Sequence, residues 1–367
     1  MPALLLSLFF LLTVSPVFGQ TDTLRLIFAG DIMGHAPQIK SAQTGKNEYD
    51  YTPCFRFVKP LLERADLAIG NLELTLPGKP PYTGYPMFRS PDALAEALKI
   101  SGFDVLVTAN NHSNDARGAG VRETLDALRR LDFWQTGTFK NQQERDAMYP
   151  LMIHKNGFKL ALLNCTYGTN GVPTEPPTIV NLIDTVELAQ DLAVAEARQP
   201  DFTIVFIHWG LEYQLKENDE QRDIARFLIA HGADLVIGAH PHVVQPIKRE
   251  SAQAPDGSVR EAWVVYSLGN FISNQQQPHT DGGILFQADL VKKRDTRGAV
   301  LGDFGYLPVW RYIHKSGPKT TFFALPIARF ERDPDIFPSM AAAARAKMLA
   351  YAEALRKRLA SCPEITF

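Results

Sequence analysis

Residues 24–31 have the sequence LRLIFAGD, a short apolar run followed by glycine and Asp31. A short, β-prone apolar run of this kind is typical of a buried strand. The acidic side chain follows the strand directly, at the point where the chain must turn. We therefore predict a buried strand over 24–29 whose carboxyl end presents Asp31.

The same order, an apolar strand followed by a ligand-type side chain, recurs along the chain. In open α/β sheets the carboxyl ends of the strands gather at one edge, and ligands bind there. If these strands share one sheet, their polar residues converge on one crevice. The residues are Asn71 and Glu73 after 67–70, Asn110, Asn111 and His112 after 105–108, His208 after 202–207, His240 and His242 after 235–238, and Asn270 after 263–267.

The rest of the pattern predicts strands that alternate with helices. Asn156-Gly157 suits a two-residue turn, so 151–154 and 159–165 are predicted to form a hairpin, which argues against an all-parallel sheet. The pattern favours a layered α/β fold, an α+β sandwich, over a barrel. We expect helices over 55–64, 91–100, 118–131, 184–198, 217–231 and 340–359, a strand over 283–290, loops over 77–86 and 166–178, and a β-ribbon from 292 to 330.

Composition limits the class of protein. The chain has 367 residues, 45% of them hydrophobic, and a formal net charge of -2. This suits one large domain, which we place over 21–330 with a C-terminal helix in 331–367 packed on it. Near-neutral charge gives no electrostatic reason to expect nucleic acid as a partner. Three scattered cysteines are too few for a disulfide framework, although one disulfide is compatible with them.

The N-terminus differs from the rest of the chain. Leu4 to Val14 is almost entirely apolar, and no charged residue precedes Asp22. This pattern is typical of a signal peptide over 1–20, cut after Gly19, and predicts an exported, periplasmic or extracytoplasmic protein. The segment lacks the usual Lys or Arg after Met1, so an uncleaved membrane anchor is the alternative.

The donor types at the strand ends indicate a metal site. Carboxylate oxygens and imidazole nitrogens, without thiolates, suit Mn, Zn or Fe. They exceed what one ion needs, so two divalent ions could share them and hold a hydroxide as nucleophile. Taken singly, Asp31 could be a helix cap, Asn110 and Asn111 could form a turn, and His208 could be a core histidine. Their repetition at successive strand ends favours the metal site.

Six ordered motifs carry a family resemblance: FAGDIMGH, GNLE, ANNH, FIHWGLEY, GAHPHVVQP and YSLGNF. They are similar to those of the CapA-type poly-γ-glutamate capsule-synthesis proteins, which look like a branch of the calcineurin-like metallophosphoesterases. The resemblance covers about residues 24–290. It implies a metallophosphatase-like layered fold with mixed central sheets and flanking helices.

The resemblance also implies roles for the residues in the motifs. No histidine stands two residues after Asp31, and Asn71 stands where a bridging aspartate is expected, so Glu73 becomes the expected bridge. These departures imply a first metal position that is weakly occupied or absent. The implied metal ligands are Asp31, Glu73, Asn111, His208, His240 and His242. The implied catalytic residues are His112, as the acid, and Asp31, with Asn71, Asn110 and His35 as neighbours or further ligands.

Other matching segments are expected to face the substrate. The guanidinium of Arg89 could bind a carboxylate or phosphate in bidentate fashion, and the alternative is a surface ion pair. The remaining expected substrate-binding residues are Tyr167, Asn170, Glu212, Tyr213 and Asn270.

Two functions from different classes follow. The first is an exported, phosphoesterase-like metal-dependent hydrolase of capsule-polymer biosynthesis, acting on an anionic polymer or on a small phosphoester or γ-glutamyl substrate. The second is a non-catalytic assembly component that binds anionic polymer on the same fold, alongside capsule-synthesis membrane proteins. A weaker third is a solute-binding domain without metal. Fold resemblance alone does not separate them.

Overall fold

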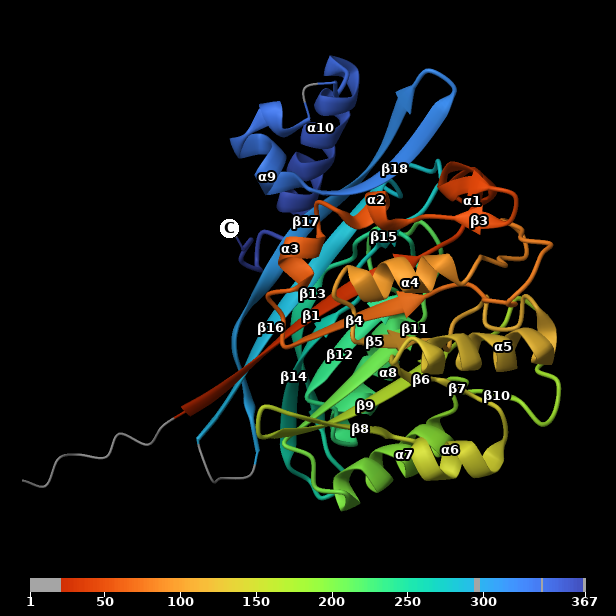
Figure 1. Cartoon of the computed structure of the whole chain (residues 1–367). Helices are drawn as coiled ribbons and strands as arrows, with labels where there is room; N and C mark the ends of the chain where they lie inside the picture. The colour runs from red at the N-terminus through yellow and green to blue at the C-terminus, as the bar shows by residue number, and fades with distance from the viewer. Residues whose placement is uncertain (1–20, 294–297, 338, 366–367) are drawn as a thin grey trace, which may run out of the picture.

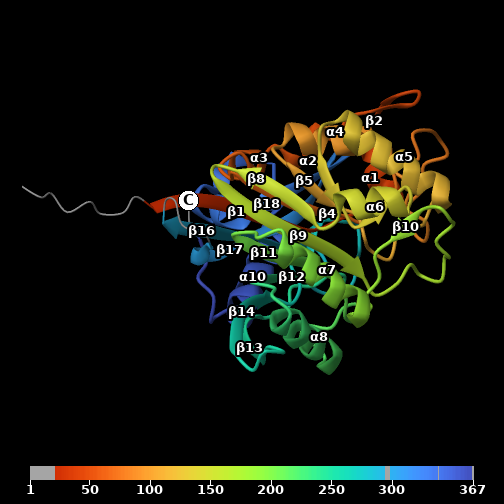
Figure 2. The same cartoon turned by 90° about the horizontal axis from the view of Figure 1, so that it is seen from below.

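The computed structural model describes residues 21–293, 298–337 and 339–365. Two β-sheets pack face to face, with helices on their outer surfaces (Figures 1 and 2). This arrangement confirms the expected mixed, layered α/β fold. The signal peptide expected over residues 1–20 lies outside the described residues. Among the helices of the described ranges, none is both long and apolar enough to span a membrane.

The first sheet is built around β1 (Thr21–Ile32). On one side β1 pairs in parallel with β4, which is followed by the parallel strands β5 and β6, and on the other side it pairs antiparallel with β16. The short strand β15 also pairs with the end of β1. The other strands are β4 (Leu67–Leu72), β5 (Val105–Val107), β6 (Trp134–Thr136), β15 (Asn270–Ile272), β16 (Gly282–Lys293), β17 (Val300–Ser316) and β18 (Lys319–Pro326).

The second sheet has the strand order β13-β14-β12-β11-β9-β8. The predicted hairpin is confirmed, with Asn156 (φ 49) and Gly157 (φ 80) both in the left-handed region that a primed turn needs. The hairpin of β13 and β14 was not predicted. The strands are β8 (Leu151–Lys155), β9 (Phe158–Thr166), β11 (Phe202–His208), β12 (Leu235–Ala239), β13 (Ile247–Gln253) and β14 (Val259–Val265).

Alternation along β1 divides the apolar core into layers. Leu26 and Phe28 face the second sheet, where the ring of Phe28 lies 6.5 Å from that of Phe206, while Ile27 and Ala29 face the helices on the opposite side. The outer face of the first sheet is covered by α2 (Thr52–Phe55), α3 (Lys59–Leu62), α4 (Ala93–Ile100) and α5 (Arg117–Arg130). The outer face of the second is covered by α7 (Thr185–Ala197) and α8 (Asp219–Ala230).

Short elements complete the described chain. The C-terminal α10 (Ala342–Arg358) contributes Met348, Tyr351 and Leu355 to the core and lies beside β17 (Figure 1). The others are α1 (Ala36–Ala42), β2 (Gln43–Gly45), β3 (Glu48–Tyr49), β7 (Thr138–Phe139), α6 (Gln142–Met148), β10 (Ile179–Val180), α9 (Ile327–Arg332) and the 3-10 turn Pro334–Ile336.

Three expectations need correction or refinement. The continuous helix over 55–64 is wrong: Pro60 lacks an N–H and clashes with the preceding turn, so the chain forms α2 and then restarts as α3. The strand ends do not share one sheet, because β1, β4 and β5 belong to the first and β11 and β12 to the second. The predicted β-ribbon is present as β17 and β18, but it ends at Pro326 and α9 follows. All three cysteines are buried free thiols.

Candidate metal centre

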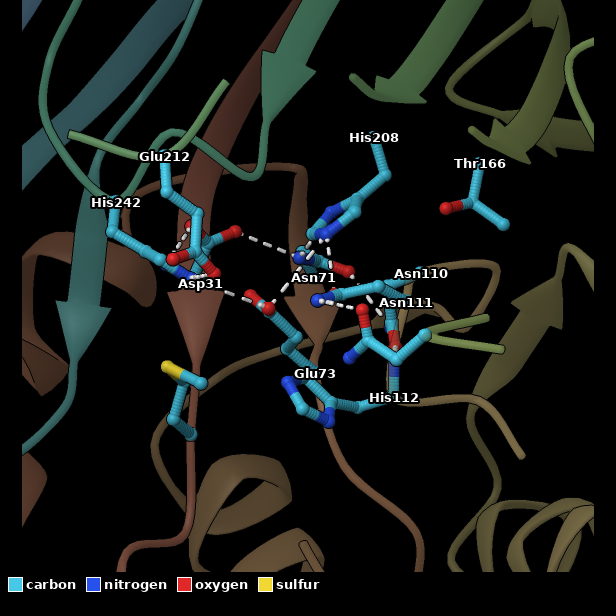
Figure 3. Close-up of polar contacts among 12 residues, drawn as sticks. Asp31, Asn71, Glu73, Asn110, Asn111, His112, Thr166, His208, Glu212 and His242 are labelled. Carbon is cyan, nitrogen blue, oxygen red and sulfur yellow. Dashed lines mark hydrogen bonds and ion pairs between the residues drawn. The ribbon is translucent and has the colours of Figure 1, made fainter. Parts of the chain in front are cut away.

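The polar side chains at the strand ends of both sheets meet in one buried cluster (Figure 3). Asp31 lies at the end of β1, Glu73 directly after β4, and His208 at the end of β11. Each is at most 1% exposed. Figure 3 shows Asp31, Asn71 and Glu73 pointing toward His208 and His242, which come from the opposite sheet. The cluster therefore lies where the carboxyl ends of two packed sheets converge.

Asn71 connects the two halves of this cluster. Its Nδ2 donates to Asp31 Oδ1 at 2.8 Å and lies 3.3 Å from His208 Nδ1. Asn110 Nδ2 donates in turn to Asn71 Oδ1 (3.2 Å) and to the Leu72 carbonyl (2.8 Å). Asn71 and Asn110 thus fix the orientations of a carboxylate and an imidazole from different sheets.

Glu73 is the central residue of the cluster. Its side chain is 0% exposed, and neither Oε1 nor Oε2 has a hydrogen-bond partner among the described residues. Oε1 lies 3.6 Å from His208 Nε2 and 3.7 Å from His242 Nε2. A buried carboxylate without hydrogen bonds is costly, so its position fits a residue that binds a cation.

The donor atoms fall into groups of the size that a metal ion needs. In three groups all donor atoms lie within 4.8 Å of one another, and Glu73 belongs to two of them. Ligand atoms about 2.1 Å from one ion lie roughly 3.0–3.4 Å apart, close to the distances around Glu73. The groups are Asp31, Glu73 and His242; Glu73, His208 and His240; and Glu212, His240 and His242. The residues therefore fit a divalent metal centre.

Asn111 lies beside the second of these groups. Its Oδ1 is 2.8 Å from His208 Nε2, the nitrogen that also approaches Glu73. Its Nδ2 contacts Asn170 Oδ1 at 3.4 Å. Three potential ligand atoms, Asn111 Oδ1, His208 Nε2 and Glu73 Oε1, therefore lie close together.

Burial and neighbouring charges set the protonation of the cluster. Burial, and then the negative charge of Asp31, raise the pKa of Glu73 well above its ordinary value. Burial, and then the other imidazoles, lower the pKa values of His208 and His240 well below theirs. The two histidines are consequently neutral at pH 7, the form in which imidazole binds metal.

The segment carrying His240 and His242 has an unusual backbone. His240 has φ 100 and His242 has φ 59, both in the region that non-glycine residues rarely adopt. His242 Nδ1 lies 3.0 Å from Asp31 Oδ2 and 3.2 Å from Asn270 Oδ1, which anchors the strained segment on the first sheet.

His112 lies beside the donor groups but belongs to none of them. Its Nδ1 is 2.7 Å from Asp115 Oδ2, and both side chains are buried. The sequence analysis missed Asp115, which stands three residues after His112. The spacing of the stretch Asn110 to Asp115 (NNHSND) carried that signal, because a loop that turns after a strand brings such neighbours together.

The expected substrate residues occupy different surroundings. The ring of Tyr167, 45% exposed, lies 4.5 Å from that of His240, and the ring of Tyr213 lies 6.2 Å from that of His242. Burial, followed by Glu73 and Glu212, raises the pKa of Tyr167 to about 12. Glu212 Oε1 is 3.9 Å from His242 Nε2. These three side chains therefore border the metal cluster on the side of the second sheet.

His35 and Arg89 have different surroundings from the side chains that border the metal cluster. The structure does not bring His35 into any donor group; its Nε2 contacts Ser273 Oγ at 3.2 Å and its ring packs edge-on against Phe88. Arg89 Nε is buried without a hydrogen-bond partner, and none of the ion pairs among the described residues involves this side chain. The surface ion pair considered for Arg89 is thus not seen.

Comparisons with a family model and with curated proteins both find bacterial capsule-synthesis proteins. The family model described as "Bacterial capsule synthesis protein PGA_cap" matches residues 25–275. "Capsule biosynthesis protein CapA" of Bacillus anthracis is 29% identical over 304 residues, which cover 78% of this chain and 68% of the relative. "PGA biosynthesis protein CapA" of Bacillus subtilis (strain 168) is 29% identical over 320 residues, covering 81% and 73%.

A solved structure, that of TT1561 from Thermus thermophilus, overlaps 77% of this chain and 99% of its own, with a TM-score of 0.37 and 11% identity. This overlap is too loose to support an argument about fold or function.

Proposed function

This chain belongs to the bacterial capsule synthesis (PGA_cap) family, and we propose that it is a divalent-metal-dependent, phosphoesterase-like hydrolase of capsule-polymer biosynthesis. Membership of this family supports a role in capsule-polymer biosynthesis. One observation supports the chemistry: Glu73 is buried, without hydrogen bonds, between His208 and His242. A bound cation would stabilise the carboxylate in this position. A protein core without a cation would not keep a buried carboxylate that has no partner.

Two ions, of Mn, Zn or Fe, are the proposed cofactors. When bound, such ions act as Lewis acids and supply an activated water. The proposed first site is formed by Asp31, Glu73 and His242, and the second by Glu73, His208, His240 and the amide oxygen of Asn111. Glu73 is common to both, so it would be the ligand that the two sites share, a role that the neutral amide of Asn71 would not fill.

The chain's own groups perform the remaining steps. His112 donates a proton to the leaving group, and Asp115 Oδ2 orients its imidazole from 2.7 Å. Tyr167 and Tyr213 contact the substrate beside the cluster, and Arg89 is a further proposed substrate contact. The proposed substrate is an anionic capsule polymer or a small phosphoester or γ-glutamyl precursor, and the relatives are named for capsule and PGA biosynthesis.

Asn71 favours a second candidate function. An amide at this position removes one negative charge from the centre, which weakens its hold on metal. The alternative is therefore a polymer-binding assembly component that does not turn its ligand over.

One experiment separates the two functions. Bound metal is measured by elemental analysis, and phosphomonoester, phosphodiester and γ-glutamyl substrates are assayed with the wild-type and His112→Ala proteins. Turnover that disappears in His112→Ala while the metal remains supports the hydrolase. Metal without turnover on any substrate supports the assembly component, and a metal-free protein from every preparation refutes the hydrolase.

We also propose that the protein works outside the cytoplasm, on the basis of the apolar run from Leu4 to Val14. The mass of the protein recovered from a secreting host checks this. A mature chain beginning at Gln20 supports cleavage after Gly19, and an intact Met1 in the membrane fraction supports an anchor.

A further inference from the structure

A cleft of about 580 Å³ lies between the loop after β15, strand β17 and the start of α10. Its walls include Gln275, Asp281, Arg311, Ala343 and Lys347. Most of them follow residue 275, where the match to the family ends. We call it the β17–α10 cleft.

Arg311 is an unpaired buried cation in the wall of this cleft. The residue is 8% exposed, and its Nη2 donates to the Gln275 carbonyl at 3.0 Å. Its Nε is buried with no hydrogen-bond partner, and no ion pair joins it to a carboxylate within residues 21–293, 298–337 and 339–365. A guanidinium has five N–H donors, and the hydrogen bond from Nη2 is the one that this side chain forms with the described residues. A buried cation in this state favours an anion.

Helix α10 adds a second positive feature to the same cleft. The 17-residue helix begins at Ala342, and its N-cap residue Ala341 makes no side-chain capping hydrogen bond. Its first turn contains no acidic residue, and Ala341 and Ala343 both line the cleft. The free N–H groups and the positive end of the helix dipole therefore act where Arg311 lies.

The charges of the lining select the kind of anion. Arg311 and Lys347 are cationic, and Asp281 is the carboxylate of the lining, with its Oδ2 accepting a hydrogen bond from Trp310 Nε1 at 2.9 Å. A single net positive charge remains, among amide side chains such as that of Gln275. This balance matches a carboxylate, with one negative charge, better than a dianionic phosphate.

A short chain of contacts joins the cleft to the metal cluster. Gln275 accepts from Arg311 through its carbonyl and from Asn270 Nδ2 through Oε1, the latter at 2.8 Å. Asn270 Oδ1 in turn lies 3.2 Å from His242 Nδ1. Two residues, Gln275 and Asn270, thus connect the wall of the cleft to the metal cluster.

We propose that the β17–α10 cleft is a carboxylate-binding subsite, which holds one carboxylate of an anionic polymer while another part of the same chain lies at the metal cluster. The subsite deepens the proposed function and rests on it for the identity of the polymer. Arg311 binds the carboxylate through paired N–H donors, and Lys347 and the α10 amides contribute attraction.

Binding of a γ-linked glutamate decamer tests this proposal. A fluorescent decamer is titrated by anisotropy into metal-free protein, so that the measurement does not depend on turnover. We expect Arg311→Gln to weaken binding about tenfold, as for a desolvated Arg–carboxylate pair. Lys347→Gln, at an exposed position that tolerates change, is expected to weaken it about threefold. Lys315→Gln removes the same charge from the exposed part of β17 and is the matched control, expected to change binding less than about twofold.

Three results would overturn the subsite. Equal losses in Arg311→Gln and Lys315→Gln would mean general electrostatic attraction. Unchanged binding of a decamer whose carboxylates are amidated would exclude carboxylate recognition, and tighter binding of a short polyphosphate would assign the cleft to phosphate. If the melting temperature shows that Arg311→Gln does not fold, the test rests on decamer binding by Lys347→Gln compared with Lys315→Gln.

The outcomes also separate the subsite from the hydrolase. Arg311-dependent binding by a protein without turnover retains the subsite and refutes the hydrolase. Turnover together with binding that does not depend on Arg311 retains the hydrolase and refutes the subsite.

Discussion

His112 Nδ1 lies 2.7 Å from Asp115 Oδ2, in a buried pair beside the metal-binding cluster. Asp115 Oδ2 also accepts the backbone N–H of Phe88, whose ring packs edge-on 4.6 Å from the imidazole. No hydrogen bond to His112 Nε2 is formed by the described residues. The imidazole is thus held through one nitrogen and can use the other on a substrate.

This geometry predicts separate effects on metal and on rate. His112→Ala should lower kcat by about 10²–10⁴, the usual contribution of a positioned acid or base, while the metal content stays at the wild-type level. Asp115→Asn should lower kcat less and shift the pH–rate profile, because it changes the imidazole through its partner. The exposed His154, replaced by Ala, is the control. Loss of metal in His112→Ala would contradict this division of roles.

Glu73→Gln and His240→Ala should act on the metal itself. His240→Ala removes a donor, and Glu73→Gln removes the negative charge of a donor, from two of the three donor groups. Loss of a residue that only supports a ligand lowers metal affinity about 10–100-fold, and we expect a loss at least as large here. Competition with a fluorescent chelator measures this affinity, and circular dichroism verifies the fold. Wild-type affinity in both variants would show that the cluster is not a metal centre.

Metal binding should release protons from the cluster. In the metal-free protein the raised pKa of Glu73 keeps its carboxyl protonated at a pH where a free glutamate is ionised, and an arriving cation must displace that proton. Apparent metal affinity should therefore increase with pH until the pH exceeds the raised pKa of Glu73. His208 and His240, with lowered pKa values, are already neutral at pH 7 and release none.

Titration calorimetry in two buffers of different ionisation enthalpy measures this release at a pH slightly above the ordinary pKa of a free glutamate. Binding heats that do not depend on the buffer would contradict it.

Gly30→Ala should destabilise the protein at the edge of the centre. An added Cβ would lie 1.9 Å from the Gly269 carbonyl oxygen, which accepts the Asp31 N–H at 3.0 Å. Overpacking of this kind costs about 1–3 kcal/mol, and here it would also displace Asp31. We expect lower values of both the melting temperature and metal affinity. Gly168→Ala, where a Cβ would meet nothing within 4 Å, is the control, and equal behaviour of the two variants would contradict the packing argument.

Local sequence patterns predicted the structure correctly where a feature depends on a single strand or turn. The buried strand after residue 23, the Asn156-Gly157 hairpin and the positions of Asp31 and His208 at strand ends all followed from apolar runs and turn residues. Pro60 was the local signal that the predicted helix over 55–64 ignored. The φ values of His240 and His242 could not be predicted, because packing against Asp31 and Asn270 imposes them.

The sequence by itself determined which side chains follow which strands, because hydrophobic periodicity and turn chemistry act over a few residues. The tertiary structure alone decided that these strands belong to two sheets, that Glu73 lacks hydrogen bonds, and that Arg311 is buried in the wall of the β17–α10 cleft. The physical reason is that burial, desolvation and charge pairing depend on residues brought together from distant parts of the chain. Arg311 and Asn270 are separated along the chain by a whole strand, yet both contact Gln275.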